Sequence, residues 1–472
     1  RRSPDIRAIA DRFRPIAFWR AARVPLVASI PLLGLGIWTG QMVRAGYEGK
    51  PQRNAAKAYW KRNSATWDGS PAAALDGVDA EVRLFPERRG LEVRGTFVLR
   101  NPHSEPMSEL PLTVGRHLKA SSWTVDGDPV EPTDGDAPPP AIENRSGLFV
   151  VRPRAPLETG DTVRVGFELT GSFPSGWSKL SGGMSEFVLP AGVVLTSFSP
   201  SFLPVPGFVD SIGVDDKNAR DAKEYPPDHW RQQVDPLFGP AWSSDVRLTI
   251  EGPASWVLNG CGVEESSELL ADGRKRVVWQ TEHPVRFFNI IGGPLEAAPG
   301  RQTTIYFDPR TPHNVPTMVR SLDAARTRYG EWFAAYPWTN LRVTEFPGLA
   351  GYAQGFPGNI SFAESIGFLA APVDDDTASD TFDSAFYIVA HEAAHQWWGN
   401  IVTPGKGPGG NVVSEGLAEF SACMLMHHEL SPDQAKVLRR RWEWTYVNGR
   451  EPDNERPINR IDGSRPGDTV VT

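Results

Sequence analysis

The sequence predicts a multidomain chain with a membrane-spanning helix, then a β-rich domain of sandwich or saddle type, then an α+β domain. Three patterns support this order: an uncharged run near the start, short alternating segments in the middle, and strands mixed with helix-length patterns from about residue 300 onward. The 472 residues leave room for two or three domains. The expected divisions are a cytoplasmic flank at 1–23, the span at 24–43, a helical connector at 44–75, the β-rich domain at 76–298 and the α+β domain at 299–472.

The composition excludes two classes of protein. A net charge of −8 argues against a nucleic-acid partner. The two cysteines, Cys261 and Cys423, stand far apart, so they form neither a disulfide framework nor a metal motif. We expect both to be packed thiols.

The predicted membrane span lies at residues 24–43. This run carries no formal charge, lies between Arg23 and Arg44, and has the length of about 20 residues that crosses a bilayer. Trp19 and Trp38 lie where interfacial aromatic residues are expected. A signal peptide and a buried helix are the alternatives, although the charged leader is long for a signal peptide. Basic residues on both sides prevent the positive-inside rule from deciding the orientation.

Alternating patterns dominate the middle of the chain, after a polar connector that is expected to be helical over residues 46–67. They predict strands at 81–84, 91–99, 147–151, 162–169, 246–250 and 276–280. Many short strands separated by turn clusters indicate a β-sandwich or a saddle-shaped β domain.

The pattern changes again near residue 300. Residues 303–307 and 341–346 read as strands, with an amphipathic helix at 315–333 between them. An apolar run of helix length at 382–390 then leads into the most informative motif of the chain. This mixture predicts the α+β class for the last domain.

That motif is His391-Glu392-Ala393-Ala394-His395. Residues four apart share one face of a helix, so His391 and His395 can bind one ion. Glu392 lies slightly round that face, where a base acting on a metal-bound water is better placed than a third ligand. A chance pair of histidines on a packed helix is the alternative, but the chain has only nine histidines.

A catalytic zinc ion usually takes three protein ligands, so the sequence downstream should supply one more. Glu415 is the candidate, because a Gly- and Pro-rich reversal at 403–410 lets a second helix at 413–430 return to the first. We therefore expect one zinc ion per chain.

The run HEAAHQWWGN, followed by SEGLAEF, resembles the gluzincin aminopeptidases, the aminopeptidase N-like family of zinc metallopeptidases. The resemblance implies a thermolysin-like catalytic domain, with a β domain covering one side of its cleft. It implies zinc ligands at His391, His395 and Glu415, and a water-activating base at Glu392.

One departure concerns the spacing. Nineteen residues separate His395 from Glu415, one more than in the family, and strict spacing would select Ser414. We therefore expect a one-residue loop insertion. The longer gap also resembles a membrane-attached branch in which the peptidase domain is fused to an ABC-transporter-type permease.

The substrate side matches less well. Residues 352–364 occupy the place of the family's G-x-M-E-N motif, whose Glu pairs with the α-amine of the substrate, and here that Glu falls at Gly355. Gln354 and Gly355 are the substrate-binding candidates, and selection for a free N-terminus should be weak. A solvated loop amide is the alternative for Gln354. Glu345 and Glu364 are alternative carboxylates, each better explained as a strand-end or surface group.

Two further groups were weighed. Glu419, one turn after Glu415, either accepts the second N–H of a zinc-bound histidine or is a helix-surface carboxylate. By resemblance, the Tyr that stabilises the oxyanion falls beyond Thr472, which leaves the catalytic domain incomplete. Tyr446 lies in an aromatic stretch and is better explained by packing.

The sequence thus predicts a membrane-anchored zinc metallopeptidase, aminopeptidase-like, that acts on peptides. Its expected partners are peptide substrate, membrane lipid through the span and, by resemblance, permease segments or subunits. We expect it at the cell membrane with the catalytic domain outside the cytoplasm. The alternative is a non-catalytic, zinc-containing peptide-binding or structural module of a membrane permease complex.

Overall fold

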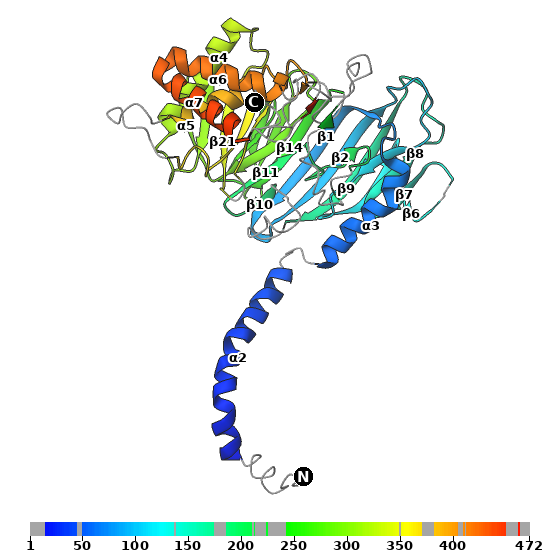
Figure 1. The fold of residues 1–472 in the computed structure, drawn as a ribbon. Coiled ribbons are helices and arrows are strands. Elements are labelled where there is room, and N and C mark those ends of the chain that lie inside the picture. Colours follow the sequence, from blue (N-terminus) through cyan, green and yellow to red (C-terminus); the bar gives the residue numbers. More distant parts are fainter. Residues whose placement is uncertain are drawn as a thin grey trace.

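Strands make up most of the folded body, the helices after residue 300 gather on one side of it, and one long helix near the N-terminus projects away (Figure 1). The computed structural model describes residues 15–44, 50–135, 138–173, 186–209, 212, 223–224, 242–348, 351–370, 382–404, 409–410, 412–449 and 461–462. Residues 1–14 of the predicted flank and 450–460 of the predicted catalytic domain lie outside the described residues.

The projecting helix is α2 (Pro15–Arg44), and it begins before the predicted span. Within it, Ala22–Gln41 is long and apolar enough to cross a membrane, and none of its most apolar stretch is buried. The alternative of a buried core helix therefore does not fit. A signal sequence has the same length and composition, so α2 is a candidate membrane span. Helix α3 (Lys50–Trp67) forms where the helical connector was expected.

The largest sheet has eight strands, and alternating side chains explain it. In β2, Leu91, Val93, Phe97 and Leu99 are at most 3% exposed, while the alternate residues Glu92, Arg94, Thr96 and Val98 are less buried. In spatial order the strands are β16 (Val263–Leu269), β17 (Arg274–Gln280), β14 (Asp245–Pro253), β1 (Ala74–Phe85), β2 (Gly90–Arg100), β9 (Thr162–Ser172), β4 (Leu118–Val125) and β5 (Asp128–Pro129).

Two smaller sheets share a hydrophobic core with this one. One has the order β12 (Val205–Pro206), β3 (Leu110–Thr113), β8 (Leu148–Arg152), β7 (Ala141–Arg145) and β6 (Pro132–Thr133). The other has the order β10 (Phe187–Leu189), β11 (Gly192–Thr196), β18 (Asn289–Gly293) and β15 (Val257–Gly260). The β-rich region is thus three sheets around one core. A separate pair joins β13 (Lys223–Glu224) to β24 (Ile461–Asp462).

The last sheet supports the candidate site. Its order is β19 (Glu296–Pro299), β20 (Thr303–Phe307), β21 (Leu341–Phe346), β23 (Asn359–Ala363) and β22 (Ala353–Phe356). A second hydrophobic core joins it to the helices (Figure 1). These are α4 (Val315–Trp332), α5 (Ser384–Ala394), a π-helical turn η5 (Val412–Gly416), α6 (Leu417–Glu429) and α7 (Pro432–Gly449).

A buried polar network connects this sheet to the four-stranded one. Asn259 donates to Thr344 Oγ1 at 3.0 Å, and Asn359 donates to Asn289 Oδ1 at 3.0 Å. Asn289 in turn donates to Ser361 Oγ at 2.8 Å. All five residues are at most 3% exposed. Because unpaired polar groups are costly in such an interior, the network fixes how the two sheets meet.

The predicted fold class is confirmed in its coarser form, as a multidomain and mostly sheet protein. All the predicted strands occur, several of them longer than expected, and those at 303–307 and 341–346 match β20 and β21 at both ends. We missed strands such as β11 and β18, whose residues are all buried and therefore show no alternation. Both cysteines are buried and free, as predicted. The domain boundaries stay a prediction.

Candidate active site

Helix α5 carries the two histidines and is held firmly. Asp383 caps its start by accepting the Phe386 N–H at 2.9 Å. Two side chains of α4 donate to its backbone: Ser321 to the Phe386 carbonyl at 2.7 Å, and Tyr329 to the Ala390 carbonyl at 3.2 Å. The apolar run predicted before the motif thus forms a buried helix, which fixes the direction in which the histidines point.

Three donor atoms converge at the end of α5. His391 Nε2 and His395 Nε2 are 3.2 Å apart, and Glu415 Oε2 lies 3.3 Å from the first and 3.6 Å from the second. Ligands about 2.0–2.1 Å from a tetrahedral zinc ion lie about 3.3 Å from one another. The spacing and the N/N/O donor set therefore fit zinc. Among the described residues, these three form a group that could hold a metal ion.

The additional residue between His395 and Glu415 does not displace the carboxylate. Glu415, and not its neighbour Ser414, reaches the histidines, and it does so from η5. A π-helical turn closes i to i+5 hydrogen bonds and occurs mainly at functional sites. The π-helical turn can accommodate the additional residue within the helix, whereas we expected it in the preceding loop. Residues 405–408 of that loop lie outside the described part of the chain.

The two histidines are oriented by different groups. His395 Nδ1 lies 2.9 Å from the Trp398 carbonyl oxygen, so the tautomer protonated at Nδ1 donates there and leaves Nε2 free for a metal. His391 Nδ1 is buried and has no hydrogen-bond partner among the described residues. Glu419 Oε2 lies 3.9 Å from it and is also buried without a partner. The structure thus places Glu419 behind His391.

The charges of the site favour a bound cation. Burial lowers the pKa of His395, but hydrogen bonding to Glu415 and the charge of Glu392 outweigh it and raise this pKa to about 9. Burial acts to raise the pKa of Glu415, yet His391 and His395 hold it well below its ordinary value. Without a metal the site therefore retains a proton as its positive charge.

Glu392 has the environment of a base. It is 7% exposed, and burial raises its pKa above the ordinary value, while the histidines and a hydrogen bond from the backbone of Gly355 oppose the rise. A carboxylate with a raised pKa accepts a proton more readily near neutral pH.

On the substrate side, β22 packs directly against α5. A Cβ atom at Gly355 would lie 2.7 Å from the Glu392 carbonyl oxygen and 2.9 Å from His395 Cβ. Real Cβ atoms do not approach backbone so closely, so a carboxylate at this position would require the strand to shift. Gln354 precedes Gly355 on the same edge strand and is half-buried.

Two polar residues after the motif anchor this strand, and sequence reasoning gave neither a role. Gln396 donates to the Phe356 carbonyl at 2.8 Å and accepts the Gly358 N–H at 2.9 Å. Asn400 donates to the Gly355 carbonyl at 2.8 Å. The available signal was that both are amides that directly follow the zinc motif. Tyr387, one turn before His391, was also missed.

The alternative carboxylates lie in other surroundings. Glu345 is 3% exposed and accepts the Asp308 N–H at 2.6 Å and the Thr311 hydroxyl at 3.1 Å. Glu364 accepts the Gly348 N–H at 3.1 Å. These contacts support the expectation that each is a structural carboxylate.

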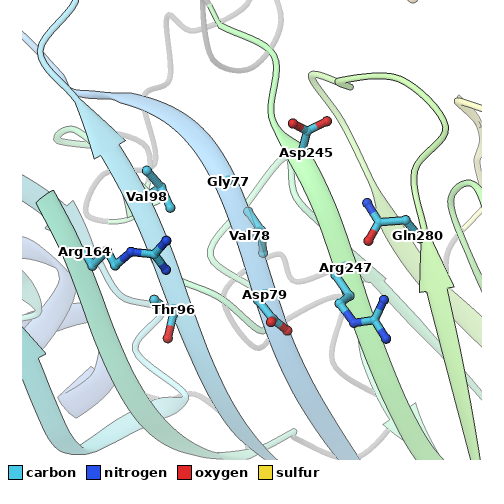
Figure 2. Close-up of a pocket in the computed structure, with 9 residues that line it drawn as sticks. All are labelled: Gly77, Val78, Asp79, Thr96, Val98, Arg164, Asp245, Arg247 and Gln280. Carbon is cyan, nitrogen blue, oxygen red and sulfur yellow. The ribbon is translucent and has the colours of Figure 1, made fainter. Parts of the chain in front are cut away.

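A separate shallow pocket of about 260 Å³ lies on the eight-stranded sheet (Figure 2). Strands β1, β2, β9, β14 and β17 supply its lining, which includes Asp79, Arg164 and Asp245. No residue of α5, β22 or α6 lines it. This pocket is therefore distinct from the histidine cluster.

The fold resembles that of solved zinc metallopeptidase structures. No protein-family model and no curated protein matches the sequence. Among solved structures, the M1 zinc metallopeptidase from Deinococcus radiodurans is similar over 85% of this chain and 80% of its own, at 17% identity and a TM-score of 0.57.

Two mutant structures are also similar, both at 17% identity and a TM-score of 0.54. One is a glutamate-to-alanine mutant of the Deinococcus radiodurans enzyme bound to a Tyr-Ser-Ala substrate, with 85% of this chain and 79% of that chain covered. The other is a two-domain M1 mutant bound to L-tryptophan, with 85% and 80% covered. At this identity the likeness concerns the fold. None of the three is described as part of a permease, so the predicted resemblance to permease-fused peptidases has no support from them.

Proposed function

We propose that this chain is a zinc-dependent metallopeptidase, aminopeptidase-like, in which His391, His395 and Glu415 hold the metal. The observation that carries the proposal is the set of donor separations from 3.2 to 3.6 Å, which matches tetrahedral zinc. The M1 fold supports it, since structures of that fold are described with a peptide and with an amino acid bound.

Glu392 is the proposed general base. A zinc ion in this site would polarise the scissile carbonyl and lower the pKa of a water molecule. The Glu392 carboxylate accepts the proton of that water and then gives it to the leaving amine. The backbone N–H of Gly355 holds the carboxylate, and burial raises its pKa toward neutral pH. The side chain of Glu415 is 43% exposed, so the cluster remains open to substrate.

The proposed substrate is an extended peptide lying beside β22. This strand is the edge of its sheet, so those of its backbone groups that pair neither with β23 nor with Glu392, Gln396 or Asn400 can bind a peptide strand. Gln354 and Gly355 are the proposed contacts. Because packing against α5 leaves no room for a carboxylate at Gly355, we expect cleavage of peptides with a blocked N-terminus as well as a free one.

Helix α2 is the proposed anchor, with the catalytic region outside the cytoplasm. Its exposed apolar surface supports this arrangement. Alkaline carbonate extraction of membranes tests it, because an anchored chain stays in the pellet. Recovery of the chain in the supernatant, shortened by the length of α2, would instead identify a cleaved signal sequence.

The deciding experiment compares the full chain with Glu392→Gln. We expect stoichiometric zinc in both proteins and hydrolysis only by the wild type, with N-acetylated peptides cleaved alongside free ones. Hydrolysis retained by Glu392→Gln would refute the assigned base. Zinc without hydrolysis of either peptide class would favour the non-catalytic peptide-binding or structural module.

A further inference from the structure

The two histidines differ in what fixes their rings. The Nδ1 atom of His395 is held by a backbone carbonyl, which no side-chain substitution removes. The Nδ1 atom of His391 has no hydrogen-bond partner among the described residues, and neither has Glu419 Oε2, 3.9 Å away. Both atoms are buried, one can donate and the other can accept. Leaving both atoms buried without a partner costs free energy, so a hydrogen bond between them would stabilise the folded protein.

The other carboxylate oxygen of Glu419, Oε1, is held by a side chain of α5. The hydroxyl of Tyr387 donates to Glu419 Oε1 at 2.5 Å. Tyr387 lies on α5 one helical turn before His391, whereas Glu419 lies on α6, so the contact joins α5 to the helix that continues directly from η5, the turn that carries Glu415. With Oε1 fixed in this way, Oε2 is the atom of Glu419 that lies toward His391.

We propose that Tyr387 is a positioning residue for His391, acting through Glu419; this inference rests on the proposed zinc site. A movement of about 1 Å brings Glu419 Oε2 within hydrogen-bond distance of His391 Nδ1. That bond keeps the proton of His391 on Nδ1, which leaves Nε2 as the metal-binding atom. The ring of Tyr387 also lies against that of His391, with centroids 6.2 Å apart, and Tyr387→Phe keeps this contact, so loss of the hydroxyl acts through the carboxylate.

A purely structural role makes a different prediction. The ring of Tyr387 packs against Phe382, with centroids 5.1 Å apart. Tyr387→Phe keeps this packing and removes only the hydroxyl. A matched control exists in Tyr329→Phe, which removes a buried hydroxyl that donates to the Ala390 carbonyl of the same helix but does not touch Glu419.

The test measures zinc affinity and not activity. The full chain in detergent is stripped of metal, and its Kd for zinc is determined by competition with a chromophoric chelator. The absorption spectrum of the Co²⁺ form reports the ligand geometry. We expect Tyr387→Phe to raise the Kd about 10-fold, at the lower end of the roughly 10–100-fold loss seen when a group behind a ligand is removed. Tyr329→Phe should weaken zinc binding clearly less than Tyr387→Phe does, because it removes one of several contacts that hold α5 but leaves the Glu419 carboxylate untouched.

A double variant separates positioning from packing. If Tyr387 acts through Glu419, Tyr387→Phe should add nothing to the loss of affinity already caused by Glu419→Ala, whereas independent effects would add. Wild-type affinity in Tyr387→Phe, or full additivity in the double variant, would overturn this inference alone. Failure of the wild-type chain to bind zinc would overturn the proposed zinc site and this inference together.

Discussion

The metal side and the substrate side of the candidate site are formed by different kinds of groups: side chains on the first and strand backbone on the second. On the metal side, side chains from α5 and η5 converge so that three donor atoms lie within 3.6 Å of one another. On the substrate side the strand β22 presents a glycine, and the polar side chains nearest to it, Gln396 and Asn400, bind its backbone. The metal-binding donor atoms and the strand beside them are therefore supplied by separate elements, which meet where the Gly355 N–H holds Glu392.

Because of this difference, the metal ligands can be retained while the residues of the substrate side change. The metal side depends on residue identity, since in proteins zinc binds the N, O or S donors of a few side chains, namely His, Cys, Asp and Glu. The substrate side depends on clearance, because α5 lies against Gly355. Under the proposed function, the metal chemistry is kept while selection for a free amine is lost.

The largest effect should come from removing a ligand on the metal side. We expect Glu415→Ala to weaken zinc binding by more than the roughly 100-fold upper range for residues behind a ligand. Ser414→Ala is the control for the unusual spacing, and it should bind zinc as the wild type does. Zinc content after dialysis measures both. A loss of zinc in Ser414→Ala with retention in Glu415→Ala would reverse the assignment of the third ligand.

A second prediction tests whether the Glu345 carboxyl stabilises the fold or binds substrate. Burial raises the pKa of this carboxyl to about 8, against an ordinary value of 4.5. Between these values the unfolded chain releases the proton while the folded protein keeps it, so stability falls as pH rises from about 4.5 to 8. At about 1.4 kcal/mol per pH unit, the full loss is on the order of 5 kcal/mol.

Glu345→Gln keeps a neutral side chain and should flatten that part of the curve. Urea denaturation at pH 5 and pH 8.5, for the variant beside the wild type, measures it. The ratio of the rates on free and N-acetylated peptides should not change in the variant. If that ratio changes while the pH dependence of stability does not, Glu345 is a substrate group after all.

The same contrast explains what could be predicted from the sequence. The pairing of His391 with His395 follows from helix geometry, and Glu415 was predicted from the need for a third ligand and from the family resemblance. The structure brings the three residues together. Strands such as β2 were predictable because their alternation is visible, whereas the fully buried β11 and β18 look like any short apolar run. The close approach of Gly355 to His395, at the end of α5, could not be predicted, because contacts between segments far apart in the chain leave no local pattern in the sequence.

The partners of buried polar groups were equally hard to predict. Glu419 was placed near the histidines by its helical spacing, but its bond to Tyr387 depends on how α5 packs against α6. The network that joins Asn259, Thr344 and Asn359 connects segments far apart in the chain. Each asparagine alone is typical of a loop, and only the packing of two sheets makes it part of a core.

The smallest effects are expected within β22, where two substitutions separate the steric fit of Gly355 against α5 from the proposed substrate contact of Gln354. Gly355→Ala places a Cβ atom against backbone, and overpacking of this kind costs about 1–3 kcal/mol of stability. We expect a lower urea midpoint and a reduced kcat, because the strand that holds Glu392 through a backbone N–H is displaced. Gln354→Ala should leave the midpoint unchanged and raise KM by no more than about 10-fold, the value of one hydrogen bond. Equal midpoints for the wild type and Gly355→Ala would show that β22 yields easily, and the glycine would then no longer explain the missing carboxylate.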